Sequence, residues 1–477
     1  MKPQPKAVPA APDGWLLRLF VTLLGAFLGL TLLKFGNPPN MESFVSAPAD
    51  VWEFLIVSPW PIAWAYSLLG LVAVLGLITA RWKADAPLWL VALPLVWLAW
   101  QFFAASYSLD AHVSPGIVVH FAACGVCFYL GLFSLARARS LAAFWLGITL
   151  AFLLVLVVGW EQHFGGLAET RRYFWANIYP TLKSPQPPEY FKKLNSTRIF
   201  ATLFYPNTLA GALLLLLPPV LMAVACIRRL TIPARAFLVT VIALAALACL
   251  RWSGSKAGWL LMLLLGIVAL LRLPFDKKLR IALVAGVLFL GLAGFFWQFA
   301  TLLKRGAPSA SARLDYWEAA VRITRAHPLL GSGPGTFGSS YLAIKRPESE
   351  PARLTHNDYL EQACDSGLPG FVTYSAFVLG ALLWSAPYRR PGFHRQQAPA
   401  VSEGLAAFLK LCFRAARQTG MPRSTSPALA QDRWRFAVWL GVLGWSLQGL
   451  FEFGLYIPAL AWPAFTFIGW LLGAVKK

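Results

Sequence analysis

The stretch THNDYLEQACDSGLPGFVTYSAFVLGALLWSA, residues 355–386, joins a polar helix signal directly to an apolar run long enough to cross a membrane. Thr355 is a candidate N-cap with Asp358 three positions on, a weak capping box, and Gly367 is a candidate helix end. This pattern predicts His356 in the first helical turn, where the positive end of the helix dipole disfavours imidazolium. A neutral His beside an anion site is a candidate general base, although an ordinary capped interfacial helix would explain the same residues.

The composition outside this stretch is that of a membrane protein. Hydrophobic residues make up 58% of the 477 positions and charged residues 13%, and the mean hydropathy is +0.60. Apolar runs close to twenty residues long recur along the chain, and a helix of that length spans about 30 Å of hydrocarbon. We therefore expect an all-α polytopic membrane protein with about twelve transmembrane helices, near residues 15–35, 61–80, 87–104, 113–135, 141–160, 203–226, 233–250, 257–272, 281–299, 369–386, 436–454 and 457–474.

The connections between these runs predict the orientation. The short connections 36–60 and 105–112 contain no Lys or Arg, whereas the alternate connections are basic. By the positive-inside rule both termini are expected to be cytoplasmic. A net charge of +22 could suggest a nucleic-acid partner, but the position of the cations along the chain matters more than their sum. We therefore expect no nucleic-acid partner. The basic connection 387–435 contains an amphipathic stretch, 402–418, expected to lie on anionic headgroups.

Sixteen of the 42 basic residues nevertheless fall in three connections on the predicted outer side. Long loops cross the membrane whatever their charge, so some of these cations need have no function. The alternative is an anionic ligand handled at the outer membrane face, and we favour it because the same connections hold the other motif-like residues. These cations are Arg171, Arg172, Lys183, Lys192, Lys193 and Arg198 in the first connection, Arg251 and Lys256 in the second, and eight residues within 300–368.

Each of the three connections has its own pattern. NSTRIFATLFYPNTLAG (195–211) leads into an apolar run with Arg198 close to the interface, where a lone Arg is usually an anchor. RWSGSKAGW (251–259) predicts a tight turn that holds Lys256 at the membrane surface, and an ammonium group there suits phosphate. SARLDYWEAAVRITRAHPLLGSGPGTF (311–337) predicts an amphipathic helix that ends at His327, followed by a glycine loop that folds back under it.

The sequence lacks the residue patterns of several other kinds of site. The six His are scattered and none is paired at metal-ligand spacing, so we expect no metal site and no cofactor. The GSGPG segment is not followed by Gly-Lys-Ser/Thr, which excludes a phosphate loop of the nucleotide-binding type. The sequence also has no nucleophile elbow and no dinucleotide fingerprint.

The order of motifs from 195 to 370 resembles the O-antigen ligase and O-antigen polymerase superfamily, a group of polytopic bacterial glycosyltransferases. The ligase branch has the signature His-Asn, nine residues, Gly, two residues, Gly, and His356, Asn357, Gly367 and Gly370 fit it. The resemblance implies a GT-C-like arrangement of about twelve helices with a large helical periplasmic loop, in the bacterial inner membrane. It implies metal-independent, inverting transfer of a glycan from undecaprenyl diphosphate to an acceptor hydroxyl on the periplasmic face.

The resemblance also implies roles for individual residues. His356 matches the essential His, and Arg313 matches an Arg one helical turn before an aromatic residue, here Trp317. Lys256 stands where the family commonly has Arg, which keeps the charge but loses the bidentate fork. The candidate site residues are therefore His356 and Arg313 as catalytic groups; Arg198, Lys256, Arg313 and Arg251 for the diphosphate; and Asn357, Gly367, Gly370, Trp317 and Asn207 as structural residues of the motifs.

The domain organisation follows from the runs and connections together. We expect five N-terminal transmembrane helices in 1–160, a basic periplasmic loop in 161–202 and helices six to nine in 203–299. A large periplasmic loop with the active site would occupy 300–368. The last three helices, with the basic cytoplasmic connection 387–435, would occupy 369–477.

Three other functions fit parts of the sequence. A polymerase would use the same chemistry with a second carrier-linked repeat as acceptor, instead of the lipid A-core of a ligase, and a protein O-oligosaccharyltransferase would use a protein. A transporter would also have twelve spans, but transporters usually carry ionisable groups near the bilayer midplane. Here the central runs lack Asp and Glu, and Glu452 lies only near the outer end of the run 436–454.

Overall fold

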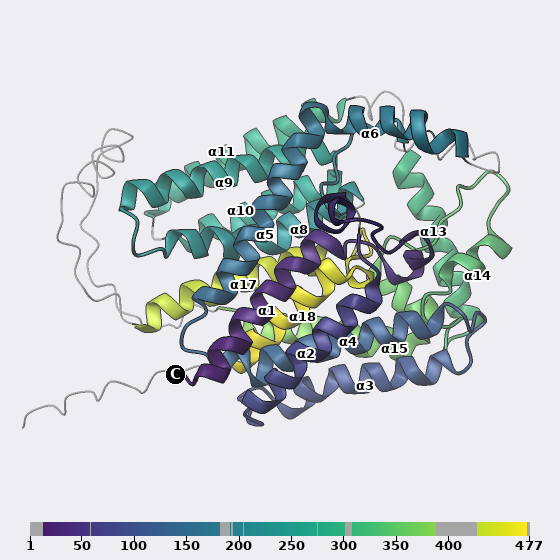
Figure 1. Ribbon diagram of the computed structural model, residues 1–477, viewed down its shortest axis with the longest axis horizontal. Helices are drawn as coiled ribbons and strands as arrows, with labels where there is room; N and C mark the ends of the chain where they lie inside the picture. The colour runs from purple at the N-terminus through teal and green to yellow at the C-terminus, as the bar shows by residue number, and fades with distance from the viewer. Residues whose placement is uncertain are drawn as a thin grey trace, which may run out of the picture.

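The computed structural model describes residues 13–57, 59–181, 191, 194–203, 205–273, 275–300, 308–387 and 427–474. Within these residues the chain forms helices and no β-strand, which confirms the predicted all-α fold (Figure 1). The expected amphipathic stretch 402–418 and the cations Lys183, Lys192 and Lys193 lie outside the described residues.

Every predicted apolar run is helical. Among the described helices, nine are long and apolar enough to cross a membrane: α1 (Trp15–Lys34), α2 (Ile62–Thr79), α3 (Leu88–Ala105), α4 (Ser114–Phe133), α5 (Ala142–Glu161), α8 (Pro206–Ala225), α9 (Ile232–Ser253), α11 (Lys277–Gln298) and α15 (Asp358–Ser385). The other three runs form the shorter helices α10 (Lys256–Arg272) and α18 (Pro458–Gly473), and α17 (Pro427–Gln448), whose first turns are polar. The chain is thus a polytopic membrane protein.

The helix α18 lies at the centre of the bundle. Its residues are almost all buried, and it packs against α4, α17, α1 and α8. Its contact with α4 is backbone to backbone, because a Cβ built on Gly469 would lie 2.0 Å from the Phe128 carbonyl oxygen. Small residues commonly allow this close approach between membrane helices. The buried centre therefore fixes the C-terminal part of the chain, including the connection between α17 and α18.

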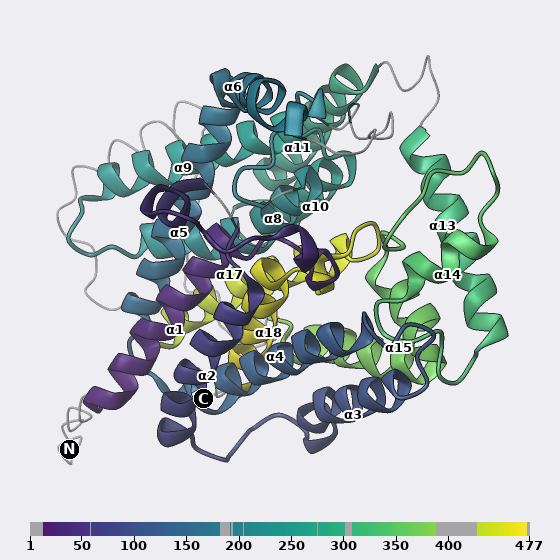
Figure 2. The ribbon, with the colours of Figure 1, turned by 45° about the vertical axis from the view of Figure 1, so that its right-hand side comes forward.

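The remaining elements are short and lie between the long helices. α13 (Pro308–Ala326) and α14 (Phe337–Ile344) lie together at one end of the molecule (Figures 1 and 2). The others are α6 (Leu167–Tyr173) and the 3-10 or π segments η1 (Pro39–Phe44), η2 (Glu53–Val57), η3 (Leu135–Arg137), η4 (Gln162–Gly166), η5 (Phe174–Ile178), η6 (Tyr179–Thr181) and η7 (Gly454–Tyr456).

The start of α1 and the end of α18 lie on the same side of the bundle. The Asp13 carboxylate accepts a hydrogen bond from the Arg139 backbone N–H at 2.9 Å, in the connection between α4 and α5. At the other end of the chain, a Cβ on Gly473 would lie 2.4 Å from the Leu132 carbonyl oxygen, at the end of α4. The start of α1 and the end of α18 therefore lie beside the end of α4 and the connection that follows it, and the cytoplasmic location of both termini stays a prediction.

The beginning of α15 differs from its prediction. Its N-cap is Asn357, whose side-chain oxygen accepts from the backbone N–H groups of Tyr359 and Leu360, both at 3.0 Å. The expectation that Thr355 caps the helix is wrong, because its hydroxyl donates instead to the Asn357 carbonyl at 2.8 Å. His356 accordingly lies before the helix and not in its first turn, with a left-handed backbone (φ +54°).

Gly367 breaks α15 without ending it. It adopts φ +69°, and the helix continues beyond it to Ser385. A Cβ at this position would lie 2.0 Å from the Leu329 carbonyl oxygen, and the Leu368 N–H donates to the Pro328 carbonyl at 2.8 Å. Only glycine combines this backbone conformation with so close an approach. The kink thus makes room for the segment after α13.

Candidate active site

Glu452 joins three of the candidate residues in one buried cluster. It lies between α17 and η7 and is 5% exposed. One carboxylate oxygen accepts hydrogen bonds from Arg313 Nη2 and Asn207 Nδ2, and the other lies 3.0 Å from His356 Nδ1. Residues from α13, the start of α8 and the start of α15 therefore meet at a single carboxylate.

Arg198 extends this cluster toward the turn between α9 and α10. Its Nη2 donates to Asn207 Oδ1 at 2.7 Å, and its Nε donates to the Ser253 carbonyl at 2.7 Å. Burial lowers the pKa of the guanidinium, while the nearby Tyr205 and Glu452 favour its charged form. Arg198 is thus a partly dehydrated cation held in a fixed orientation, rather than a surface anchor.

The second connection forms the predicted tight turn. Gly254 is left-handed (φ +60°) and ends α9, and the Ser255 hydroxyl accepts from the Gly258 N–H at 3.2 Å to cap α10. Lys256 occupies the first position of α10, ahead of the apolar run. Its pKa is lowered by burial and then by the positive charges of Arg198 and Arg313, so the three cations share one region.

Arg251 is placed differently from the other cations. It lies in the last turn of α9 with an exposed side chain. The described contacts do not join it to Glu452, Arg198 or Arg313. The structure thus brings Arg198, Asn207, Arg313 and His356 together, with Lys256 beside them, and leaves Arg251 outside the cluster.

His356 is surrounded by aromatic rings and is partly accessible. Its ring centroid lies 4.9 Å from Phe453, 6.0 Å from Tyr316 and 6.1 Å from Tyr205, and its side chain is 19% exposed. A carboxylate next to Nδ1 favours the tautomer with the proton on Nδ1. The lone pair of Nε2 is then available, which is the state a general base requires.

One face of α13 positions Arg313. Tyr316, Ala320 and Ile323 are buried against a small core that includes Phe337 and Tyr341 of α14. They form the buried face of the predicted amphipathic helix, and Trp317 packs at its edge. Arg322 and Arg325, on the same helix, are exposed. The apolar face therefore fixes the rotation of α13 that points Arg313 at Glu452.

The glycine loop after α13 folds back as expected. Gly331, Gly333 and Gly335 all have positive φ. The Gly333 N–H donates to the Asp365 carbonyl at 2.8 Å, and the Gly335 N–H donates to Asp365 Oδ2 at 2.6 Å. This loop ties the end of α13 to the N-terminal part of α15, which lies just after His356.

Gly370, the last residue of the signature, lies inside α15. A Cβ at this position would lie 2.5 Å from Ser366 Cβ, one helical turn earlier. The Ser366 hydroxyl in turn donates to the Gln101 side-chain oxygen of α3 at 2.6 Å. Gly370 therefore leaves space for the side chain that ties α15 to α3.

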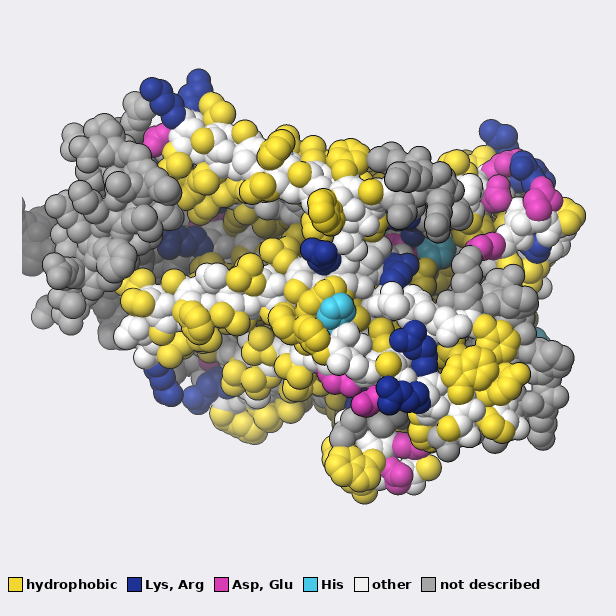
Figure 3. All heavy atoms as spheres, turned by 90° about the horizontal axis from the view of Figure 1, so that it is seen from above, with side chains coloured by type: hydrophobic (Ala, Val, Ile, Leu, Met, Phe, Trp, Pro, Cys, Tyr) yellow, Lys and Arg dark blue, Asp and Glu magenta, His cyan; other side chains and the backbone are white. Residues whose placement is uncertain are grey.

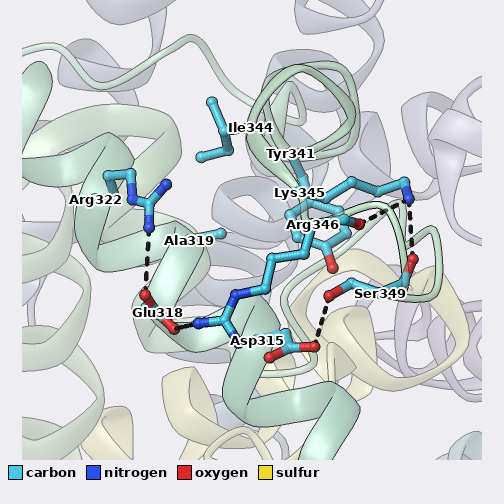
Figure 4. A pocket seen from close by; sticks show the side chains of 9 residues that line it. All are labelled: Asp315, Glu318, Ala319, Arg322, Tyr341, Ile344, Lys345, Arg346 and Ser349. Carbon is cyan, nitrogen blue, oxygen red and sulfur yellow. Dashed lines mark hydrogen bonds and ion pairs between the residues drawn. The ribbon is translucent and has the colours of Figure 1, made fainter.

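A separate shallow hollow lies between α13 and α14 (Figure 4). Glu318 forms an ion pair across it with Arg346 at 3.2 Å, and a second one with Arg322, one turn further along α13, at 3.3 Å. Tyr341 lines the hollow and packs against Tyr316 at 5.4 Å, and Tyr316 in turn packs against His356. The hollow therefore lies outside the Glu452 cluster, and none of the predicted site residues lines it.

The described residues contain no group of three or more His, Cys, Asp or Glu that could hold a metal ion.

Glu452 is the one member of the cluster to which the sequence analysis assigned no role. It follows His356 by 96 positions, so local spacing carries no information about their contact. The sequence did contain one indication that Glu452 has a partner, because an acidic residue at the end of an apolar run is energetically costly unless it is paired.

Residues 240–375 match the family model described as O-Antigen ligase. No curated protein matches the chain. The matched segment contains Lys256, Arg313 and His356, whereas Arg198 and Glu452 lie outside it.

Proposed function

Because residues 240–375 carry a domain of the O-antigen ligase and polymerase superfamily, we propose that the protein is a ligase that transfers a glycan from undecaprenyl diphosphate to an acceptor hydroxyl. The observation that carries the proposal is the convergence of Arg198, Arg313 and His356 around Glu452. The reaction takes place at the periplasmic face of the bacterial inner membrane, where the basic outer connections meet.

The cations act on the leaving group. When the bond between the anomeric carbon and the diphosphate breaks, negative charge develops on the diphosphate oxygens. Arg198, Arg313 and Lys256 stabilise that charge in a partly dehydrated site, where an ion pair is stronger than in water. In the resting protein Glu452 neutralises Arg313. A bound diphosphate competes with Glu452 for this guanidinium.

His356 acts on the acceptor. Its Nε2 removes the proton from the acceptor hydroxyl as the oxygen attacks the anomeric carbon, and the resulting imidazolium is stabilised by Glu452 through Nδ1. Release of Glu452 from Arg313 by the diphosphate strengthens this second interaction. A single displacement of this kind inverts the anomeric configuration and requires one base and one site for the leaving group.

The exposed apolar helices next to the cluster support a lipid-linked donor. α11 has no buried residue, and few residues of α9 are buried. Hydrophobic side chains cover much of the face seen from above, with Lys and Arg beside them (Figure 3). A polyprenyl chain can therefore stay in the lipid phase while its diphosphate reaches the cations.

Glycan transfer by purified variants tests the proposal. His356→Ala and Arg313→Ala are expected to lower the transfer rate by about 10²- to 10⁴-fold, because each removes a group that acts in the transition state. Arg322→Ala, an exposed Arg on the same helix as Arg313, is the control and should keep the wild-type rate. Wild-type activity in either of the first two variants would contradict the assignment.

The acceptor is tested separately. The protein is incubated with carrier-linked repeat units and no other acceptor. A ligase leaves the chain length unchanged and transfers the glycan once the lipid A-core is added. Chain lengthening without that acceptor would identify a polymerase, and transfer to a protein would identify an oligosaccharyltransferase.

A further inference from the structure

We infer that Asp358 is a positioning residue that holds Glu452 against His356. The inference rests on the proposed function, because it concerns the pair to which that function assigns proton transfer. Asp358 is the first residue of α15, two positions after His356, and it is 1% exposed. Its contacts all lead to the segment that carries Glu452.

Asp358 binds that segment on both sides of Glu452. Its backbone N–H donates to the Gly449 carbonyl at 2.7 Å. Its carboxylate oxygens accept from the Leu455 N–H at 3.1 and 3.0 Å. The residues from 449 to 455 therefore form a turn that is hydrogen-bonded to Asp358 at both ends, to its backbone at Gly449 and to its side chain at Leu455. Glu452 lies in the middle of this turn.

Asp358 also packs closely against the turn. A Cβ built on Gly449 would lie 2.9 Å from Asp358 Oδ2, so the carboxylate rests directly against the backbone of the turn. The turn has other anchors: the Phe451 and Glu452 N–H groups donate to the Gln448 carbonyl at 2.8 and 3.0 Å, and the Leu455 carbonyl lies 2.8 Å from His120 Nε2. None of these hydrogen bonds connects the turn to the segment that contains His356, although the Phe453 ring packs against His356 at 4.9 Å.

His356, the second residue of the pair, is also held close to Asp358. His356 has an unfavourable left-handed backbone that its neighbours impose. The Thr355 N–H donates to the buried Glu361 carboxylate, and Asn357 caps the helix that begins at Asp358. The position of Asp358 therefore sets both the place of His356 and the place of Glu452, and so the 3.0 Å between them.

The carboxylate acts here as a hydrogen-bond acceptor. Both of its oxygens lie at about the same distance from the Leu455 N–H, so one oxygen is sufficient for that hydrogen bond. Asp358→Asn keeps an acceptor of the same size and should preserve most of the contact. Asp358→Ala removes it and leaves the buried Leu455 N–H without this partner.

A double-mutant cycle with Glu452 tests the inference. Asp358→Ala is expected to lower kcat by about 10- to 100-fold with little change in the KM for the donor, because a shift of the order of 1 Å in a reacting group has an effect of this size. Glu452→Gln alone should lower kcat at least as much. The double variant should be no slower than Glu452→Gln, because residues that act through the same group are non-additive. Asp358→Asn should recover most of the activity.

Tyr359→Phe is the matched control. Tyr359 is the next residue of α15, and its hydroxyl donates to the Ser446 carbonyl of α17 at 3.0 Å, outside the turn. Its effect, if any, should multiply with that of Glu452→Gln. The positioning role is wrong if the fold-loss in kcat of Asp358→Ala multiplies fully with that of Glu452→Gln. It is also wrong if Asp358→Ala has the wild-type kcat.

One further variant, Gly449→Ala, and the comparison with His356→Ala keep the outcomes separate. If Asp358→Ala does not fold, Gly449→Ala tests the same contact from the other side, since its Cβ displaces the Asp358 carboxylate. Gly449→Ala should lower kcat, and its effect should be non-additive with that of Glu452→Gln. Independent effects of these two substitutions would overturn the inference. If Glu452→Gln and His356→Ala both have the wild-type rate, the proposed function fails. If both are slow while Asp358→Ala acts independently, only the positioning role fails.

Discussion

Glu452 has three partners in the resting protein, Arg313, His356 and Asn207, and the first two are candidates for the chemistry. It neutralises Arg313 and also faces His356. A buried carboxylate shared by a cation and an imidazole responds when an anion binds the cation, because the guanidinium can then turn to its new partner. Under the proposed function, substrate binding and activation of the base would be coupled through this one side chain.

Lys256 provides a prediction at this scale. Lys256→Arg keeps the charge and adds a bidentate donor, so we expect transfer within about threefold of wild type. Lys256→Ala removes a cation from the diphosphate region and should raise the donor KM by about tenfold. Steady-state kinetics with varied donor concentration distinguish the two. An unchanged donor KM in Lys256→Ala would remove this residue from the diphosphate site.

At the residue scale the sequence predicted the cations and the His but not the carboxylate that joins them. The spacing of His356, Arg313 and Arg198 follows local motifs, whereas their meeting at Glu452 depends on how α17 and α18 pack. The N-cap was assigned wrongly because Thr355 and Asn357 both cap helices well; in the structure Asn357 caps α15, and the Thr355 N–H donates to the Glu361 carboxylate six residues on. The contacts of Glu452 join residues 96 and 139 positions apart, and such contacts leave no periodic signal.

At the scale of elements, the kink in α15 separates a polar helical segment from a membrane span. The buried residues before Gly367 include Asp358, Glu361 and Asp365, and the residues after it are apolar. The apolar runs made the helices easy to predict, since their length and hydropathy are sufficient. The continuation of α15 through Gly367 was not predicted, because the kink depends on the backbone of the loop beside it.

Gly367→Ala tests this account of the kink. An alanine there is strained at φ +69° and would place its Cβ 2.0 Å from the Leu329 carbonyl oxygen, so we expect a loss of at least about 1–2 kcal/mol of stability. The measurement is the thermal unfolding midpoint of the purified protein in detergent. Gly266→Ala, within α10 and with nothing within 4 Å of the new Cβ, is the control and should leave the midpoint unchanged or slightly raised. Equal midpoints for the two variants would contradict the account.

At the scale of the whole molecule, α13 and α14 lie at the end opposite to the start of α1 (Figure 2). The positive-inside pattern predicts that this end faces the periplasm. The exposed Arg322 on α13 and the exposed Arg228, after α8, should therefore lie on opposite sides of the membrane.

Labelling in whole cells tests this orientation. In a chain whose native cysteines are replaced by serine, Arg322→Cys should react with a membrane-impermeant maleimide added outside the inner membrane. Arg228→Cys should react only after that membrane is permeabilised. The reverse pattern would put the cluster on the cytoplasmic side and would contradict the proposed periplasmic reaction.

We propose that His356 removes the proton from the acceptor at a site that binds the donor independently of this side chain. A single-turnover experiment with purified protein, lipid-linked donor and acceptor tests it most directly, because donor binding and transfer are measured in the same sample. For His356→Gln we predict a donor Kd within about threefold of wild type and a transfer rate about 10²- to 10⁴-fold lower. Transfer by His356→Gln at the wild-type rate would contradict the claim.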